Sequence, residues 1–172
     1  MDIGVMNGRH FINVASGGFG AEVTATTPQD IKRRLGGAAY TLNGLIKVWE
    51  VQPYKCTLFL PDEAPLEVSM VLIAVGNSRL AGGGFEVAPA ADPRDERLDV
   101  MVLTDAVLSE PGPTLAELRD PMKPDNRRVF YRQAASFRIG SDAHLHISLD
   151  GEPVLADSLE FSVRPAALKS VY

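Results

Sequence analysis

The sequence has 172 residues, of which 45% are hydrophobic and 23% charged, a balance typical of one globular domain rather than a disordered chain. The net charge of −5, with no polybasic run beyond Lys32-Arg33-Arg34, disfavours broad electrostatic binding to nucleic acid. No segment approaches the roughly 18–20 apolar residues of a membrane span. The start does not read as a signal peptide, and the single Cys56 cannot form an internal disulfide, so we expect a cytoplasmic chain.

The first predicted element is a β-hairpin. The segments "DIGVM" and "RHFINVA" flank Asn7-Gly8, the pair best suited to a type I′ turn because both central residues take positive φ. The strongest helical pattern follows in "TPQDIKRRLGGAAYTLNGLIKVWE", where Thr27 can cap the helix and Pro28 suits its first position. We therefore expect a helical insertion at about residues 28–50.

After residue 53 the pattern changes to short strands separated by turn residues. These are "YKCTLFL", "LEVSMVLIAV", "LDVMVLT", "RVFYRQAASFRI", "HLHISL" and "LEFSVRP". Between residues 105 and 126 four prolines favour loops, and "TLAELRD" predicts a short helix among them. The predicted fold class is mainly β (α+β): a two-sheet antiparallel β-sandwich with the helical insertion.

Three features suggest functions that their surroundings do not support. The run from Gly17 to Glu22 lacks the third glycine of a dinucleotide-binding pattern, which favours a turn where backbones pack closely. His144 and His146 alternate on a strand, but further zinc ligands are missing, which favours ordinary strand surface. Ser16 does not lie in the G-x-S-x-G motif of a hydrolase.

The segment "GNSRLAGGG" is less ordinary, because three consecutive glycines follow a strongly apolar strand. Such a run costs chain entropy unless something must approach the backbone closely. Taken alone, the run favours a flexible loop, and a ligand-approach site stays open.

Two acidic segments could carry chemistry. In "ADPRDERLD", Asp92 and Asp95 could converge with a backbone carbonyl on one cation, although the spacing does not match an EF-hand and favours a solvated turn. In "LDGEP", Asp150 and Glu152 could accept a substrate proton and hold Mg²⁺ or its waters. Asp-Gly is also an ordinary hairpin turn, which spacing alone favours.

In this order, "FINVASGGFGAEV", "VLIAVGNSRLAGGGFEVAPAADPRDERLDVMVL" and "LDGEP" resemble the C-terminal domain of the diacylglycerol kinase-like lipid kinases, a superfamily that includes sphingosine and ceramide kinases. The resemblance implies transfer of the ATP γ-phosphoryl group to a lipid hydroxyl by a two-domain protein. The sequence has no G-G-D-G-T motif, which the N-terminal α/β domain of that family carries. Residues 1–172 would then be the lipid-side β-sandwich domain, with the N-terminal ATP-binding domain absent and no kinase activity in the chain alone.

The same resemblance implies roles for individual residues. Asp150 would be the base for the lipid hydroxyl, and Glu152 would join the Mg²⁺–water network on the phosphates. The other implied site residues are Asp92, Asp95 and the carbonyl of Arg97 on a structural Mg²⁺, and Asn77, Gly82, Gly83 and Gly84 along the interdomain cleft. Glu96 stands where the family usually has glycine, so a positive φ there would strain the loop.

The expected partners are a lipid substrate and the N-terminal kinase domain of the same protein, with no nucleic acid. Mg²⁺ is the implied cofactor and ATP the co-substrate. Peripheral membrane contact and a homodimer are left open. Two alternatives also remain: a non-catalytic β-sandwich module that binds lipid or protein, and an NAD kinase-like enzyme.

Overall fold

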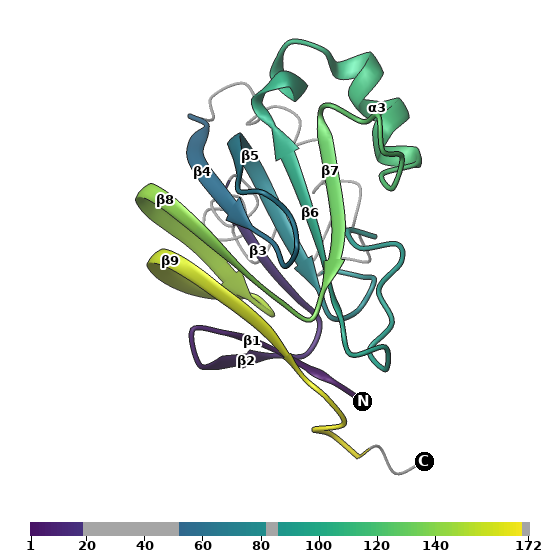
Figure 1. The fold of residues 1–172 in the computed structure, drawn as a ribbon, viewed down its shortest axis with the longest axis vertical. Coiled ribbons are helices and arrows are strands. Elements are labelled where there is room, and N and C mark those ends of the chain that lie inside the picture. Colours follow the sequence, from purple (N-terminus) through teal and green to yellow (C-terminus); the bar gives the residue numbers. More distant parts are fainter. Residues whose placement is uncertain (19–51, 82–85, 170–172) are drawn as a thin grey trace, which may run out of the picture.

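The computed structural model describes residues 1–18, 52–81 and 86–169, which form a mainly antiparallel β structure (Figure 1). The strands are β1 (Ile3–Met6), β2 (Arg9–Phe11), β3 (Val14–Gly18), β4 (Tyr54–Phe59), β5 (Leu66–Gly76), β6 (Leu98–Thr104), β7 (Val129–Ala134), β8 (Ser136–Leu149) and β9 (Glu152–Arg164). A short 3-10 helix η2 (Asp105–Leu108) and helix α3 (Pro111–Arg119) connect β6 to β7, so the predicted short helix is confirmed. The predicted insertion at about residues 28–50 lies outside the described residues.

The N-terminal hairpin has the predicted turn. Asn7 and Gly8 both have positive φ, 48° and 79°, as a type I′ turn requires. The strand after the turn was predicted to run through "RHFINVA", but it ends at Phe11, and β3 begins at Val14. The two-residue break allows β2 to pair with β1 while β3 pairs with β5 and β8.

The strands are joined in the order β2-β1-β9-β8-β3-β5-β6-β7, and β4 also pairs with both β5 and β8. Strands β3 and β4 both bridge β5 and β8, at different positions along them. A register shift in the β8–β9 pairing between Gly140 and Leu145 marks a bulge at which β8 can bend. The mainly β prediction is confirmed, and hydrogen bonds join all described strands into one sheet.

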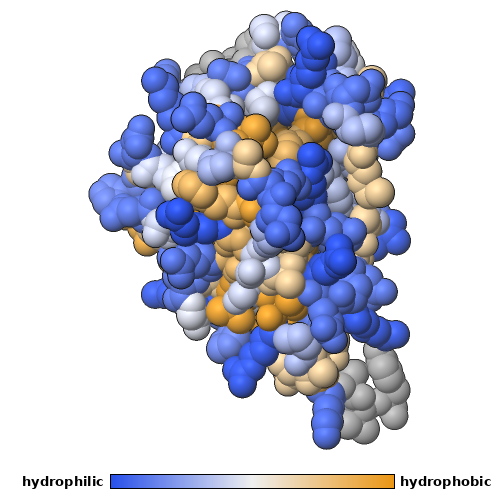
Figure 2. All heavy atoms as spheres, viewed as in Figure 1, coloured by the Kyte–Doolittle hydropathy of each residue, from blue (hydrophilic) through white to orange (hydrophobic). Residues whose placement is uncertain are grey.

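A single main core draws side chains from β1 to β9, as expected when a sheet folds over its own apolar face. Phe161 stands at one end of it, stacked on Phe137 at 4.9 Å between ring centroids and edge-on to Phe11 at 6.4 Å. Each such buried aromatic side chain contributes about 1.5–3 kcal/mol. Figure 2 shows apolar side chains gathered along the middle of one face, with polar side chains around them. Among the described residues no helix is long and apolar enough to cross a membrane.

Strand β3 packs too tightly for side chains in its second half. A Cβ on Gly17 would lie 2.2 Å from Cδ1 of Ile147 and 2.9 Å from Cγ2 of Ile73. At Gly17 the close neighbours are thus side chains, whereas a Cβ on Gly18 would lie 2.4 Å from the carbonyl oxygen of Val71. Close packing of backbones, the interpretation favoured for this glycine run, therefore holds for Gly18; residues 19–22 are not described.

The strand register brings three distant loops to the start of β3. Val14 is paired with Gly76, the last residue of β5, and Ala15 is paired with Leu149, the last residue of β8. The loops that follow β2, β5 and β8 must therefore meet at this point.

Candidate functional site

Asp150 lies at this meeting point, in the turn after β8, and its carboxylate accepts three consecutive backbone N–H groups. The N–H of Ile12 donates to Oδ2 at 2.6 Å, and those of Asn13 and Val14 donate to Oδ1 at 2.9 and 3.0 Å. The N–H of Asp150 donates in return to the carbonyl of Val14 at 3.1 Å. Asp150 is nevertheless exposed, and no ion pair to it occurs in the described part of the chain.

The turn that carries Asp150 is a tight hairpin. Asp150 and Gly151 have φ of 49° and 99°, and Glu152 begins β9 directly after them. The Asp-Gly pair therefore makes the hairpin turn that its sequence predicts. Glu152 is also exposed, so both carboxylates of "LDGEP" face solvent at one end of the β8–β9 hairpin.

Asn77 follows β5 directly and is completely buried, with 0% of its surface exposed. Its Nδ2 donates to the carbonyls of Ile12 at 2.8 Å and Asp2 at 3.1 Å, and its N–H donates to the carbonyl of Asn13 at 2.9 Å. Asn77 and Asp150 thus contact the same backbone segment, residues 12–14, Asn77 through its carbonyls and Asp150 through its N–H groups. Gly82, Gly83 and Gly84 lie outside the described residues.

The acidic loop is a tight turn held by its own backbone. The carbonyl of Asp92 accepts the N–H groups of Arg94 at 2.7 Å and Asp95 at 3.2 Å, and Oδ1 of Asp95 accepts the N–H of Arg97 at 3.0 Å. Glu96 has a φ of 61°, so the condition under which it was expected to strain the loop, a positive φ, is met.

The donor set of this loop suits a hard cation, because Asp92 and Asp95 are exposed carboxylates and the Arg97 carbonyl is a third oxygen. One oxygen of Asp95 is already engaged by the N–H of Arg97. Across residues 1–18, 52–81 and 86–169, no three His, Cys, Asp or Glu side chains converge on one point. The expected set of two carboxylates and a carbonyl therefore stays a prediction.

Asp2 connects this loop to Asn77, a contact that no sequence pattern predicts. It is 4% exposed; its N–H donates to the carbonyl of Pro93 at 2.7 Å, and its Oδ2 accepts the N–H of Glu96 at 2.9 Å. Its Oδ1 accepts the N–H of Ala166 at 2.8 Å. Together with the hydrogen bond from Asn77 to its carbonyl, these contacts join Asp2 to the acidic loop, to the loop after β5 and to the segment after β9.

Asp99, the last acid of the motif, is fully buried beside Tyr131. The Tyr131 hydroxyl donates to Oδ1 of Asp99 at 2.5 Å, and Nε2 of Gln133 donates to the same oxygen at 3.1 Å. Burial raises the pKa of the Asp99 carboxyl above its usual range, although these two hydrogen bonds oppose the shift. Burial and the neighbouring Asp99 also raise the pKa of Tyr131. Asp99 is thus directed into the fold rather than into the exposed loop.

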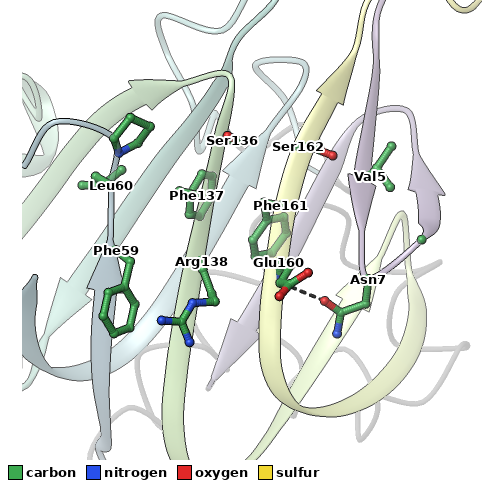
Figure 3. A pocket seen from close by; sticks show the side chains of 12 residues that line it. Val5, Asn7, Phe59, Leu60, Ser136, Phe137, Arg138, Glu160, Phe161 and Ser162 are labelled. Atoms are coloured by element: carbon green, nitrogen blue, oxygen red, sulfur yellow. Dashed lines mark hydrogen bonds between the residues drawn. The ribbon is translucent and has the colours of Figure 1, made fainter.

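A separate pocket of about 560 Å³ lies on β1, β4, β8 and β9 (Figure 3). The Arg138 guanidinium lies 3.9 Å from the ring centroid of Phe59, and the N–H of Glu160 donates to Oδ1 of Asn7 at 2.7 Å. It contains no predicted site residue, and it involves the ends of β8 and β9 opposite to the Asp150 turn. Sequence patterns did not indicate it.

The histidines of β8 behave as strand surface. His144 and His146 are both exposed, and His144 forms an ion pair with Asp157 on β9. The interpretation favoured from the sequence therefore agrees with their positions.

Comparison with known proteins identifies relatives over nearly the whole chain. The family model described as "YegS C-terminal NAD kinase beta sandwich-like domain" matches residues 13–172. Proteins named "Probable lipid kinase YegS-like" from Chromohalobacter salexigens and Pseudomonas aeruginosa are 36% and 37% identical, each over 98% of this chain. The chain spans about half of their length, 54% and 55%.

A solved structure has the same fold. It is described as a diacylglycerol kinase from Bacillus anthracis str. Sterne, with a TM-score of 0.63 and 17% identity over 95% of this chain and 50% of that chain. The names of these relatives are those of lipid kinases and of a diacylglycerol kinase.

Proposed function

Because the chain belongs to the family of YegS C-terminal NAD kinase beta sandwich-like domains, we propose that it is the acceptor-side domain of an ATP-dependent lipid kinase. In this proposal residues 1–172 receive the lipid, and an N-terminal domain that precedes them in the whole protein binds ATP. The reaction moves the γ-phosphoryl group from ATP to a lipid hydroxyl.

The observation that carries the proposal is the arrangement around Asp150. A carboxylate has roughly four acceptor positions, of which three are taken here by backbone N–H groups. An acceptor position remains on Oδ2, which among the described residues accepts a single hydrogen bond, from the N–H of Ile12. In the proposed reaction that position accepts the proton of the lipid hydroxyl as its oxygen attacks the γ-phosphorus. Phosphoryl transfer depends mainly on positioning, which a carboxylate fixed by three backbone amides provides.

Two further sets of residues have supporting roles in the proposal. Glu152, two residues after Asp150 and exposed, would contact the hydrated Mg²⁺ that accompanies ATP. Asp92, Asp95 and the Arg97 carbonyl would hold a separate Mg²⁺ in the acidic loop. When bound, Mg²⁺ neutralises negative charge, on the phosphates at the first position and among the acids of the loop at the second.

An apolar side chain lies next to the proposed base, as a lipid acceptor would require. Ile12, whose own N–H binds Asp150, is 43% exposed, and Leu80, three residues after Asn77, is 51% exposed. Single exposed apolar residues are common, so Ile12 supports the proposal only because its own N–H binds the carboxylate. In the proposal the enzyme uses ATP in the cytoplasm and contacts the membrane that holds the lipid peripherally.

The proposal is tested by phosphorylation of a lipid panel by the whole two-domain protein, with NAD as an additional acceptor. Diacylglycerol, a sphingoid base and phosphatidylglycerol form the panel, because the geometry does not distinguish among them. We expect ATP-dependent phosphorylation of at least one lipid and none of NAD. Phosphorylation of NAD alone would favour the NAD kinase-like alternative, and absence of any product would favour a binding module.

The proposal that this chain receives the lipid while another domain binds ATP is tested with the 172-residue chain alone. It has the acceptor side but no ATP-binding half, so we expect no phosphorylation of any lipid and no binding of ATP at concentrations that saturate the whole protein. Measurable turnover by the chain alone would refute this division.

A further inference from the structure

The two peptide groups between Ile12 and Val14 connect Asn77 to Asp150. In the first, the carbonyl of Ile12 accepts Nδ2 of Asn77 at 2.8 Å, and the N–H of Asn13 donates to Asp150 at 2.9 Å. In the second, the carbonyl of Asn13 accepts the N–H of Asn77 at 2.9 Å, and the N–H of Val14 donates to Asp150 at 3.0 Å. A peptide group is planar and trans, so its carbonyl and N–H point in opposite directions. Any rotation that breaks one set of bonds therefore disturbs the other.

From this arrangement we propose that Asn77 is a positioning residue that sets the orientation of the Asp150 carboxylate through the backbone of residues 12–14. The proposal rests on the role given to Asp150 above and deepens it. Asn77 is completely buried, so it acts on the Asp150 carboxylate through residues 12–14 and not by touching a substrate.

The donors of Asn77, rather than its acceptor, make the connection. Nδ2 has two carbonyl partners, whereas Oδ1 is buried with no hydrogen-bond partner among the residues that the structure describes. Ser78 adds to the same side: its N–H donates to the carbonyl of Asn13 at 3.0 Å, and its Oγ donates to Oδ1 of Asn13 at 3.2 Å. The segment is thus held by the loop after β5 on one side and by Asp150 on the other.

The network continues from Asn77 to the acidic loop. The carbonyl of Asp2 accepts Nδ2 of Asn77, and the carboxylate of Asp2 accepts the N–H of Glu96 at 2.9 Å. The acidic loop, Asp2, Asn77 and Asp150 are therefore joined by an unbroken series of hydrogen bonds. A change in the acidic loop can reach the carboxylate by this route.

Hydrogen exchange of the ¹⁵N-labelled chain tests the connection without any assumption about activity. Asn77→Asp keeps the shape of the side chain but places an oxygen against the carbonyls of Ile12 and Asp2. We expect exchange of the Asn13 and Val14 amides to accelerate at least about tenfold relative to amides in β6. Glu117→Gln, which alters a carboxylate at α3, is the matched control; it lowers overall stability but should leave the exchange of these two amides unchanged relative to amides in β6. Unaltered exchange in a folded Asn77→Asp chain would overturn the proposal.

The reverse measurement covers the outcome in which Asn77→Asp does not fold. Asp150→Asn changes an exposed turn residue, and asparagine tolerates the positive φ of this position. We expect it to shift the side-chain Nδ2–H resonances of Asn77, which Glu117→Gln should not shift. If those resonances stay in place, Asn77 and Asp150 are not coupled and the proposal fails.

In the two-domain protein, loss of the connection between Asn77 and Asp150 should lower kcat but leave KM for ATP nearly unchanged. Asn77→Asp should lower kcat about 10- to 100-fold, because a small displacement of a catalytic group has effects of this size. KM for ATP should stay within about twofold, since the nucleotide is held elsewhere. Accelerated exchange with unchanged kcat would contradict the role proposed for Asp150 and leave only the hydrogen-bonded connection. A fall in kcat without accelerated exchange would overturn the connection itself.

Discussion

Two carboxylates in this fold accept the same kind of backbone bonds but differ in what surrounds them. Glu117 of α3 accepts the N–H groups of Arg127, Arg128 and Val129 on Oε2, at 3.2, 2.7 and 3.0 Å. Asp150 accepts three consecutive N–H groups in the same way. The guanidinium of Arg128 also donates to Oε1 of Glu117 at 2.6 Å, whereas no cation pairs with Asp150 in the described ranges.

The difference indicates which of the two carboxylates can act on a ligand. The Glu117 and Arg128 side chains are 12% and 18% exposed, so their mutual bonds leave little access to solvent. Asp150 is exposed, and its φ of 49° is that of the Asp-Gly hairpin turn, close to the 48° of Asn7 in the other such turn. Backbone conformation therefore does not separate the two carboxylates. The exposure of Asp150 supports a functional role for it, whereas the enclosed contact with Arg128 supports a structural role for Glu117.

The largest expected effect is the loss of turnover when the exposed carboxylate is removed. In the two-domain protein, Asp150→Asn should lower kcat about 100- to 10,000-fold, the usual range for loss of a general base. Steady-state phosphorylation of the preferred lipid measures this. Activity within a few fold of the unaltered protein would remove Asp150 from its proposed role.

Removing the charge of Glu117 should lower stability rather than turnover. Glu117→Gln removes the charge that faces Nη1 of Arg128, while Arg128 keeps its second ion pair, with Glu110, so the free energy of unfolding should fall by about 1.5–3 kcal/mol, the usual cost of losing a hydrogen bond to a charged group. Urea unfolding followed by circular dichroism measures the change. Arg132→Gln breaks an exposed ion pair with Glu63 and serves as a control, with an expected loss below about 1 kcal/mol. Equal losses in the two variants would mean that the Glu117–Arg128 pair is no more than a surface contact.

The strain in the acidic loop should have the smallest effect. Glu96→Gly removes the side chain that disfavours a φ of 61°, so unfolding should cost about 0.5–1 kcal/mol more despite the greater freedom of glycine in the unfolded chain. The thermal midpoint of the chain should rise by a few degrees. Glu96→Gln keeps the strain and removes the charge; if it stabilises equally, repulsion among the acids is the cause instead.

The sequence predicted the local features of this site well. The Asn7-Gly8 and Asp150-Gly151 turns follow from residues that accept positive φ, and the positive φ of Glu96 followed from a glycine expected at that position. Most strands and α3 were also predicted, because alternation, β-branched residues and proline are local signals. The run "RVFYRQAASFRI" was wrongly predicted as one strand: β7 ends at Ala134 and β8 begins at Ser136.

The contacts that join these features could not be predicted, because they depend on the register of strands far apart in the chain. Asn77 meets residues 12 and 13 only because Val14 pairs with Gly76, and no sequence pattern specifies that pairing. Asp2 looks like an ordinary terminal acid until β1 and the acidic loop come together. The segment "RIGSDAHLHI" looked like two strands with a turn between them. It runs on as one strand, because β4 and β9 pair with it before the bulge and β3 and β9 after it.

In this proposal Asp150 acts on the substrate, whereas Glu117 only stabilises the fold. The difference can be measured as turnover of Asp150→Asn and Glu117→Gln in the two-domain protein, at a temperature where circular dichroism shows both variants fully folded. We expect near-normal turnover for Glu117→Gln and a loss of at least about 100-fold for Asp150→Asn. Equal turnover of the two folded variants would contradict the proposal.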